Sequence, residues 1–272
     1  MEKLKEYSLT ARKQILKMKC ISKSSHIGSA FSVIDILIYL YFRKANISDE
    51  NISDIYRDKI ILSKGHASAA LYTTLWLKGF ITDEQINNYY CDNGALPGHV
   101  DKTVSKALDL SSGSLGHGLS VAAGMGLSFK MNKLNHKIYI ILGDGELNEG
   151  SIWEAAMFIS SKNLDNVVII IDSNKLQGYD LTENILEYEK MKKMWLALKF
   201  EVKEINGNSF EDLEKGLSNL SGKPEVIIAN TIKGKGIKDI ENKLEWHYKS
   251  PNENEYKIWL KELEDKNENN IY

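Results

Sequence analysis

The sequence has 272 residues, of which 43% are hydrophobic and 26% are charged, as is typical of a folded globular protein. Its formal net charge of -2 offers no basic surface for nucleic acid, and no apolar run is long enough to span a membrane. The first residues lack the apolar core of a signal peptide, and Cys20 and Cys91 are far apart, so we expect a cytoplasmic protein without a disulfide framework.

The hydrophobic pattern predicts helices that alternate with strands along the whole chain. In chain order we expect a helix at 4–22, a helix at 33–44, a strand at 59–63, a helix within 64–79, a helix at 115–131, a strand at 137–142, a crossover helix within 148–163, a strand at 166–172, a strand near 200–205, a helix near 210–220 and a strand near 225–229. Unbroken runs such as "KIYIIL" and "NVVIIID" are typical of buried parallel strands. We therefore predict an α/β fold, with a mostly parallel sheet flanked by helices on both faces.

The chain contains no linker-like segment, so we predict a single domain over residues 1–272. The polar tail from about residue 264 to residue 272 is the exception, because "EDKNENNIY" has too few apolar side chains to pack firmly.

Polar loops follow two of the predicted strands, "GDGE" after 137–142 and "DSNKLQG" after 166–171. Adjacent parallel strands place such loops side by side, where ligands gather in α/β folds. Asp144 and Asn174 would then offer the hard oxygen atoms that Mg²⁺ or Ca²⁺ prefers. Gly143 and Gly145 would let the backbone approach phosphate oxygens. A lone GDG is often only a turn, but the second polar loop favours a cation–phosphate site.

These two loops carry a family resemblance. "GDGELNEGSIWEA" followed by "IIDSNKLQG" resembles the thiamine diphosphate motif, and residues 8–252 are similar to the diphosphate-binding, N-terminal half of a transketolase. The resemblance implies the thiamine diphosphate-binding fold, with thiamine diphosphate and Mg²⁺ (or Ca²⁺) as cofactors. It assigns the metal to Asp144, Asn174 and the main-chain carbonyl of Leu176.

Four histidines lie in segments that match further motifs of the family. "SKSSHIGSAF", "LPGHVDK" and "EWHYKSPN" contain His26, His99 and His247, which the resemblance makes catalytic. Imidazoles suit proton transfer to and from sugar hydroxyls, because their pKa lies near neutrality. "LSKGHASAALY" and "SGSLGHGLSVAAGMG" complete the cofactor site that the family implies, which contains His66, Gly113, Leu115, Gly145, Glu149, Asn174 and His247.

Other interpretations of these residues remain open. Any single histidine could be an ordinary core or surface residue. We expect His117 to be structural or to support the site without contacting the ligand, and His136 to be a surface residue before a strand. A zinc site is disfavoured, because no close-spaced pair such as HxxxH is present. Glu149 could merely stabilise a helix N-terminus. Ser114 and Tyr248 differ from the residues that are usual in the family at these positions, which leaves the identity of the sugar open.

The resemblance also implies that part of a transketolase has to come from elsewhere. Transketolases are much longer, and their next module supplies the glutamate that activates the cofactor and most contacts to the sugar phosphate. We therefore expect a split transketolase, in which a separate C-terminal subunit completes the site and two such pairs form a dimer of heterodimers. It would move a two-carbon ketol unit from a ketose (phosphate) to an aldose (phosphate). The alternatives are a subunit of another thiamine diphosphate enzyme, of the 2-oxoacid dehydrogenase type, and a non-catalytic scaffold.

Overall fold

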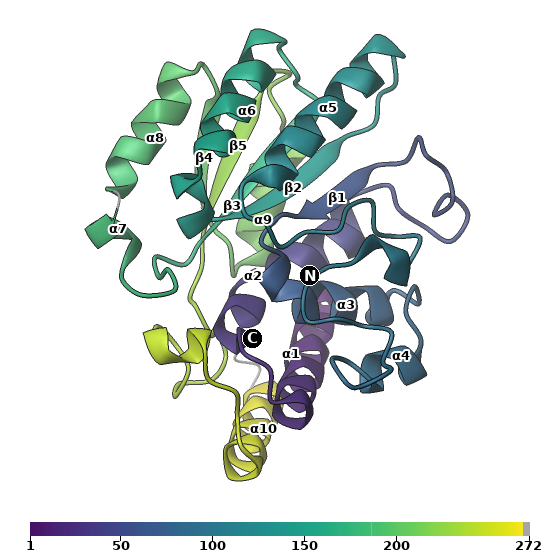
Figure 1. The fold of residues 1–272 in the computed structure, drawn as a ribbon, viewed down its shortest axis with the longest axis vertical. Helices are drawn as coiled ribbons and strands as arrows, with labels where there is room; N and C mark the ends of the chain where they lie inside the picture. The colour runs from purple at the N-terminus through teal and green to yellow at the C-terminus, as the bar shows by residue number, and fades with distance from the viewer. Residues whose placement is uncertain (186, 269–272) are drawn as a thin grey trace.

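The computed structural model describes residues 1–185 and 187–268, and within them five strands form one parallel sheet (Figure 1). The strands lie in the order β1-β2-β3-β5-β4. Their bounds are Lys59–Leu62 (β1), Ile138–Gly143 (β2), Val167–Ser173 (β3), Glu201–Asn206 (β4) and Glu225–Asn230 (β5). The predicted α/β class with a parallel sheet is confirmed.

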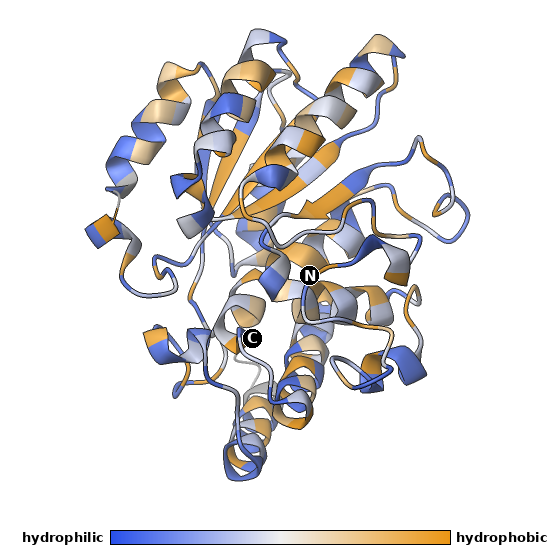
Figure 2. Cartoon of the chain, viewed as in Figure 1, coloured by the Kyte–Doolittle hydropathy of each residue, from blue (hydrophilic) through white to orange (hydrophobic). Residues whose placement is uncertain are grey.

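Helices cover both faces of the sheet. Figure 1 shows α5, α6 and α8 along one face, and these span His117–Met131, Gly150–Ser161 and Tyr188–Ala197. On the opposite face lie α2 (Ile27–Tyr39) and α9 (Phe210–Ser218). The helices α1 (Glu2–Ser22) and α3 (Ser68–Leu77) pack on α2, and α10 (Glu253–Glu268) lies against α1. Figure 2 shows the strands between these layers as strongly hydrophobic.

Side chains alternate between the two faces of the sheet, so the protein has one hydrophobic core on each face. In β2, Tyr139 and Ile141 pack toward the layer of α1 and α2, whereas Ile138 and Ile140 pack toward α5 and α6. Successive side chains of a strand point to opposite faces, so a strand buried on both sides has to be apolar throughout. This explains why the unbroken apolar runs of the sequence became the central strands.

The structure differs from the sequence prediction at several helix ends. The helix predicted at 33–44 begins earlier, at Ile27, and its last residues form a π-helical turn over Leu40–Lys44. The helices α8 and α10 were not predicted, because their sequences are largely polar. In α10, Trp259 and Leu263 are buried one turn apart, which anchors the helix. The predicted loose tail therefore continues as helix through Glu268, and residues 269–272 lie outside the described residues.

Short elements connect these layers. They are α4 (Asp83–Asn87), α7 (Thr182–Ile185) and single 3₁₀ turns at Gly65–Ala67, Lys102–Val104, Gly145–Asn148 and Leu244–His247. Two of the 3₁₀ turns carry histidines that the sequence had singled out. None of the helices in the described part of the chain is both long and apolar enough to cross a membrane.

Candidate active site

The carboxyl ends of β2 and β3 bring the two predicted polar loops together. Gly143 pairs with Asp172 in the sheet register, which places Asp144 beside the loop that follows β3. The carboxylate of Asp144 is buried and accepts hydrogen bonds from the backbone N–H of Lys175 (2.6 Å) and the hydroxyl of Thr182 (3.0 Å). Burial, helped by the charge of Asp172, raises the pKa of Asp144 to about 6. A nearby cation would hold this carboxyl in its charged form.

Asp172 holds the strand ends in place from inside the molecule. It is completely buried, and its carboxylate accepts hydrogen bonds from Ser32 (2.6 Å), from Thr231 and from the ammonium group of Lys64. These partners come from α2, from the end of β5 and from the loop after β1. Asp172 is therefore the buried junction of three segments.

A second buried lysine reaches the predicted metal position. The Nζ atom of Lys233 donates to the carbonyls of Leu176 (2.9 Å) and Gln177 (3.3 Å) and lies 3.1 Å from Nδ1 of His247. Asn174 belongs to the same loop as Leu176, and its Oδ1 accepts a hydrogen bond from the N–H of Leu176 at 3.1 Å. Burial lowers the pKa of Lys233 to about 8. The carbonyl predicted as a metal ligand thus contacts a cationic side chain in this structure.

Four of the predicted histidines meet in one cluster. The centroid of the His26 ring lies 5.0 Å from that of His66, 5.0 Å from that of His247 and 6.2 Å from that of His99. The ring centroids of His66 and His247 are 5.8 Å apart. They come from four separate segments of the chain. Burial, reinforced by neighbouring positive charges, lowers the pKa of His26 to about 3 and that of His247 to about 4. The pKa values of His66 and His99 are also lowered, so the cluster is neutral at pH 7.

His26 has an unusual backbone. Its φ of 73° places it in the left-handed region immediately before α2 begins at Ile27. Such a conformation costs roughly 1–3 kcal/mol for a residue with a side chain and is found mostly where the surroundings enforce it. Here the N–H of His26 donates to the carbonyl of His247 at 3.0 Å, and the hydroxyl of Ser25 lies 3.1 Å from its Nδ1.

A cavity of about 360 Å³ opens beside this cluster. Of the residues predicted from the sequence, its lining includes His66, Leu115, Asp144, Gly145, Glu149, Asn174, Leu176 and His247. Gly113 lies instead against the ring of His99, where an added Cβ would be 3.2 Å from Cδ2. His117 is exposed and takes no part in the cavity.

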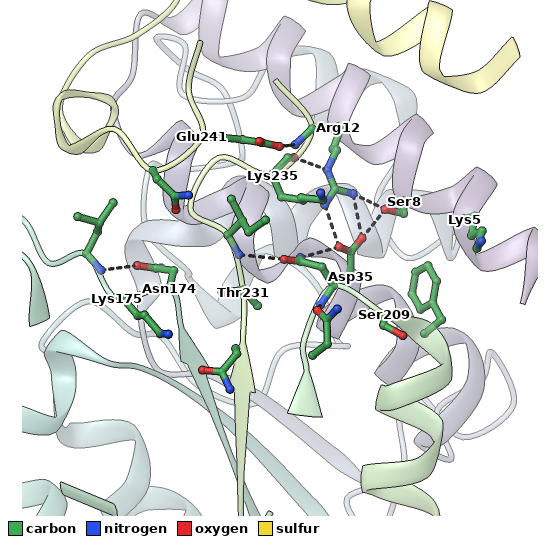
Figure 3. Close-up of a pocket in the computed structure, with 18 of the residues that line it drawn as sticks. Lys5, Ser8, Arg12, Asp35, Asn174, Lys175, Ser209, Thr231, Lys235 and Glu241 are labelled. Atoms are coloured by element: carbon green, nitrogen blue, oxygen red, sulfur yellow. Dashed lines mark hydrogen bonds and ion pairs between the residues drawn. The ribbon is translucent and has the colours of Figure 1, made fainter. Parts of the chain in front are cut away.

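A larger cavity, of about 810 Å³, lies on the other side of the loop after β3 (Figure 3). Figure 3 shows Asn174 and Lys175 at one side of it and the buried ion pair of Arg12 and Asp35 at another. Its lining contains none of the four histidines. We therefore place the candidate active site in the smaller cavity, where the strand-end groups meet the rings of His66 and His247, while His26 and His99 lie behind these rings and do not line it.

The smaller cavity suits an anionic group bound with a cation. Gln177 Nε2 is buried and has no hydrogen-bond partner within the described residues. An added Cβ at Gly145 would lie 3.1 Å from the side chain of Gln177, so the missing side chain leaves room for a ligand. Together with the buried Lys64, which lines the cavity, this cradle offers donors for phosphate oxygens beside the carboxylate of Asp144.

Sequence reasoning missed several members of the site. Lys64 directly precedes the "GH" of the second histidine segment, and Lys233 follows strand β5, so their positions at strand ends were the available signal. Glu146, rather than Glu149, is the buried acid, accepting from the N–H groups of Gly116 (2.9 Å) and Gly143 (3.1 Å) and from a serine hydroxyl. Glu149 is exposed at the N-terminus of α6.

Comparison with known proteins decides the family. Residues 8–265 match the model of the transketolase, thiamine diphosphate binding domain. The chain belongs to this family. It is 39% identical to an apulose-4-phosphate transketolase subunit of Actinobacillus succinogenes, over 97% of both chains. It is 38% identical to the 6-deoxy-6-sulfo-D-fructose transketolase subunit SqwG of Clostridium sp. strain MSTE9, over 88% of both chains.

Solved transketolases show the same fold within a longer protein. The transketolase of Campylobacter jejuni superposes with a TM-score of 0.90 at 30% identity, over 97% of this chain and 43% of that one. The present chain thus spans less than half of the solved transketolase that it resembles. By contrast, it has nearly the length of the two relatives whose names describe them as subunits.

Proposed function

We propose that this chain is the thiamine diphosphate-binding subunit of a split transketolase. It transfers a two-carbon ketol unit from a ketose or ketose phosphate to an aldose or aldose phosphate. The observation that carries the proposal is the match to two apulose-4-phosphate transketolase subunits along nearly their entire length. The neutral histidine cluster beside the strand-end cavity supports it, because this chemistry needs several proton-transfer groups around one substrate.

The strand-end groups would hold the cofactor. Asp144, Asn174 and the carbonyl of Leu176 would bind Mg²⁺ (or Ca²⁺), which in turn binds the diphosphate. The family implies diphosphate contacts from His66 and Gly145, whereas Glu149 lines the cavity as an exposed residue. When bound, thiamine diphosphate supplies the nucleophilic ring carbon that makes cleavage of the C–C bond feasible.

The hydrogen bonds of the cluster suggest different roles for its members. Lys233 is an ammonium donor to Nδ1 of His247, so the neutral His247 ring carries its hydrogen on Nε2. His247 would therefore donate to a sugar oxygen. His26 and His99 are neutral because their pKa values are lowered, and within the described residues neither ring receives a hydrogen bond from a cationic side chain, so each keeps a nitrogen that can accept from a sugar hydroxyl.

A second, C-terminal chain would complete the site. Tyr179 (72% exposed), Tyr248 (64%) and Leu181 (48%) lie at or near the two cavities, with large apolar surfaces open to solvent. Such surfaces suit an interface with the C-terminal, pyrimidine-binding subunit. We propose a dimer of these pairs in the cytoplasm, and sugars or sugar phosphates as substrates.

The test is reconstitution with the candidate C-terminal subunit. We expect two-carbon transfer from a ketose to an aldose only when both subunits, thiamine diphosphate and Mg²⁺ are present. Donors should include pentulose phosphates and the substrates in the names of the relatives, apulose 4-phosphate and 6-deoxy-6-sulfofructose. Asp144→Asn should abolish magnesium-dependent cofactor binding in calorimetry, whereas Asp180→Asn in the neighbouring loop should not. Turnover of a 2-oxoacid with a lipoyl acceptor, in place of ketol transfer, would contradict the proposal.

A further inference from the structure

Lys19 is a buried cation that the proposed chemistry does not yet use. It lies in the last turn of α1, its side chain is almost completely buried, and burial lowers its pKa to about 7. Its Nζ donates to the hydroxyls of Ser24 (3.2 Å) and Tyr89 (3.1 Å). No carboxylate contacts it among residues 1–185 and 187–268. A methionine would fill this space without the cost of burying a charge, so packing alone does not account for a lysine here.

The hydrogen bond from Lys19 to Ser24 links the ammonium group to the segment that carries His26. Ser24 lies two residues before this ring and is itself buried. It also interacts with the hydroxyl of Ser22 at 2.8 Å, so the segment between α1 and α2 is held from inside. That segment ends at the left-handed backbone of His26, which surrounding contacts have to enforce.

The hydrogen bond from Lys19 to Tyr89 links the ammonium group to the segment that carries His99. The hydroxyl of Tyr89 lies 3.4 Å from Oγ of Ser68, and Ser68 donates to the carbonyl of Gly98 at 2.7 Å. Gly98 directly precedes His99. One buried ammonium group therefore connects α1 to the backbone beside two rings of the cluster, through hydroxyl groups that are themselves shielded from water.

We propose that Lys19 is a positioning residue for ketol transfer, fixing the segments that carry His26 and His99 and placing a positive charge behind both rings. The inference rests on the proposed function, because the two rings are taken as its proton acceptors. A structural role at the helix C-terminus would need only the hydrogen bonds or the packing. The proposed role needs the charge as well.

The charge acts in the pH range where the rings titrate. Below pH 7 Lys19 is protonated, and its charge adds to burial in lowering the pKa values of His26 and His99. The other titratable groups that face His26 are His66, His99, His247 and Lys233. His99 faces His26, while the hydroxyl of Tyr72 donates to the carbonyl of His99 and accepts from the N–H of Asp101. Removing the charge of Lys19 should therefore move the pKa values of both rings upward.

The test measures the titration of histidine rings by NMR in the full chain labelled with ¹⁵N-histidine. Lys19→Met removes the charge and the donors, and Lys19→Gln removes the charge but keeps a donor. Lys17→Met, in the same helix and in contact with Asn87 at the surface, is the matched control. We expect the midpoint of His99 to rise in both Lys19 variants and to stay at the parent value in Lys17→Met.

Reconstituted activity provides the second measurement. In Lys19→Gln the acidic limb of the pH profile of kcat/KM should move to higher pH, with kcat lowered about tenfold, or ~1.4 kcal/mol of barrier. If the histidine rings of Lys19→Gln titrate at the same pH as in the parent, and its melting temperature shows that the variant is folded, the proposal is overturned. The ring titration needs no partner, cofactor or sugar, so it remains decisive even if the reconstituted parent shows no ketol transfer.

Discussion

Nζ of Lys233 lies 3.1 Å from Nδ1 of His247 and 2.9 Å from the carbonyl of Leu176, so one ammonium group joins the two ends of the site. The carbonyl belongs to the predicted cation position, and the imidazole belongs to the histidine cluster. Because the same ammonium group contacts both, a change in the binding of the cation would alter the hydrogen bond to His247. The ammonium group also fixes which nitrogen of His247 carries the hydrogen.

Lys233→Met should lower kcat of the reconstituted enzyme by about 10–100-fold, the range found when a partner that orients an active-site ligand is removed. The variant leaves Nδ1 of His247 without its donor, so the ring can adopt the other tautomer. Steady-state kinetics would measure the loss. Lys235→Met, two residues further along, is the control and should keep the parent kcat. An unchanged kcat in Lys233→Met would show that the contact has no catalytic role.

Gly145→Ala should weaken cofactor binding about tenfold, equivalent to ~1.4 kcal/mol. Its new methyl group would lie 3.1 Å from the side chain of Gln177, in the space assigned to the diphosphate. Isothermal titration calorimetry with thiamine diphosphate and Mg²⁺ would measure the change. Gly150→Ala is the matched control, because within the described part of the chain its added Cβ would meet nothing within 4 Å beyond its chain neighbours and its own helix backbone. Equal dissociation constants for the two variants would argue against this location of the diphosphate.

Acidification should destabilise the chain between about pH 6.5 and pH 4. The folded-state pKa values of His26 (about 3) and His247 (about 4) lie below the ordinary value of 6.5. In that window the unfolded chain binds more protons, so the free energy of unfolding falls as pH falls. Asp144, with its pKa raised to about 6, has the opposite effect on the free energy of unfolding between about pH 6 and its ordinary pKa of 3.8. The histidines are more numerous, so the net change is a loss of stability on acidification.

Thermal melting of the cofactor-free chain at pH 7, 6 and 5 would measure this dependence. His26→Gln should melt with a shallower dependence on pH, because one neutral buried ring has been removed. The same slope in the parent and in this variant would contradict a neutral His26 in the folded chain.

Arg12→Met should destabilise the fold by about 3–5 kcal/mol, because it leaves the carboxylate of Asp35 buried without its cation. Both oxygens of Asp35 lie 2.9 Å from the guanidinium nitrogens of Arg12, in the wall of the larger cavity (Figure 3). Denaturant unfolding would measure the loss. Arg12→Met combined with Asp35→Leu should recover much of it. Lys13→Met, which breaks the exposed pair with Glu264 at 3.8 Å, should change stability by less than about 1 kcal/mol.

The sequence predicted the sheet because buried parallel strands require uninterrupted apolar residues, as in β2 and β3. It also predicted that Asp144 and Asn174 would meet, because both follow strands that are neighbours in a strand–helix–strand unit. Family motifs identified the four clustered histidines. By contrast, polar helices such as α8 and α10 gave no clear apolar stripe and depend on a few buried anchors, such as Trp259 in α10.

Strand ends and family motifs were therefore determined by the sequence alone, since local patterns of apolar and polar residues carry that information. Only the tertiary structure decided which lysines enter the site. Lys19 looks like an ordinary surface residue in the sequence, and the strand-end positions of Lys64 and Lys233 do not by themselves tell a buried ammonium group from a solvated one. Their burial follows from packing between segments far apart in the chain, where α1 meets Tyr89, the loop after β1 meets Asp172, and the end of β5 meets the loop after β3.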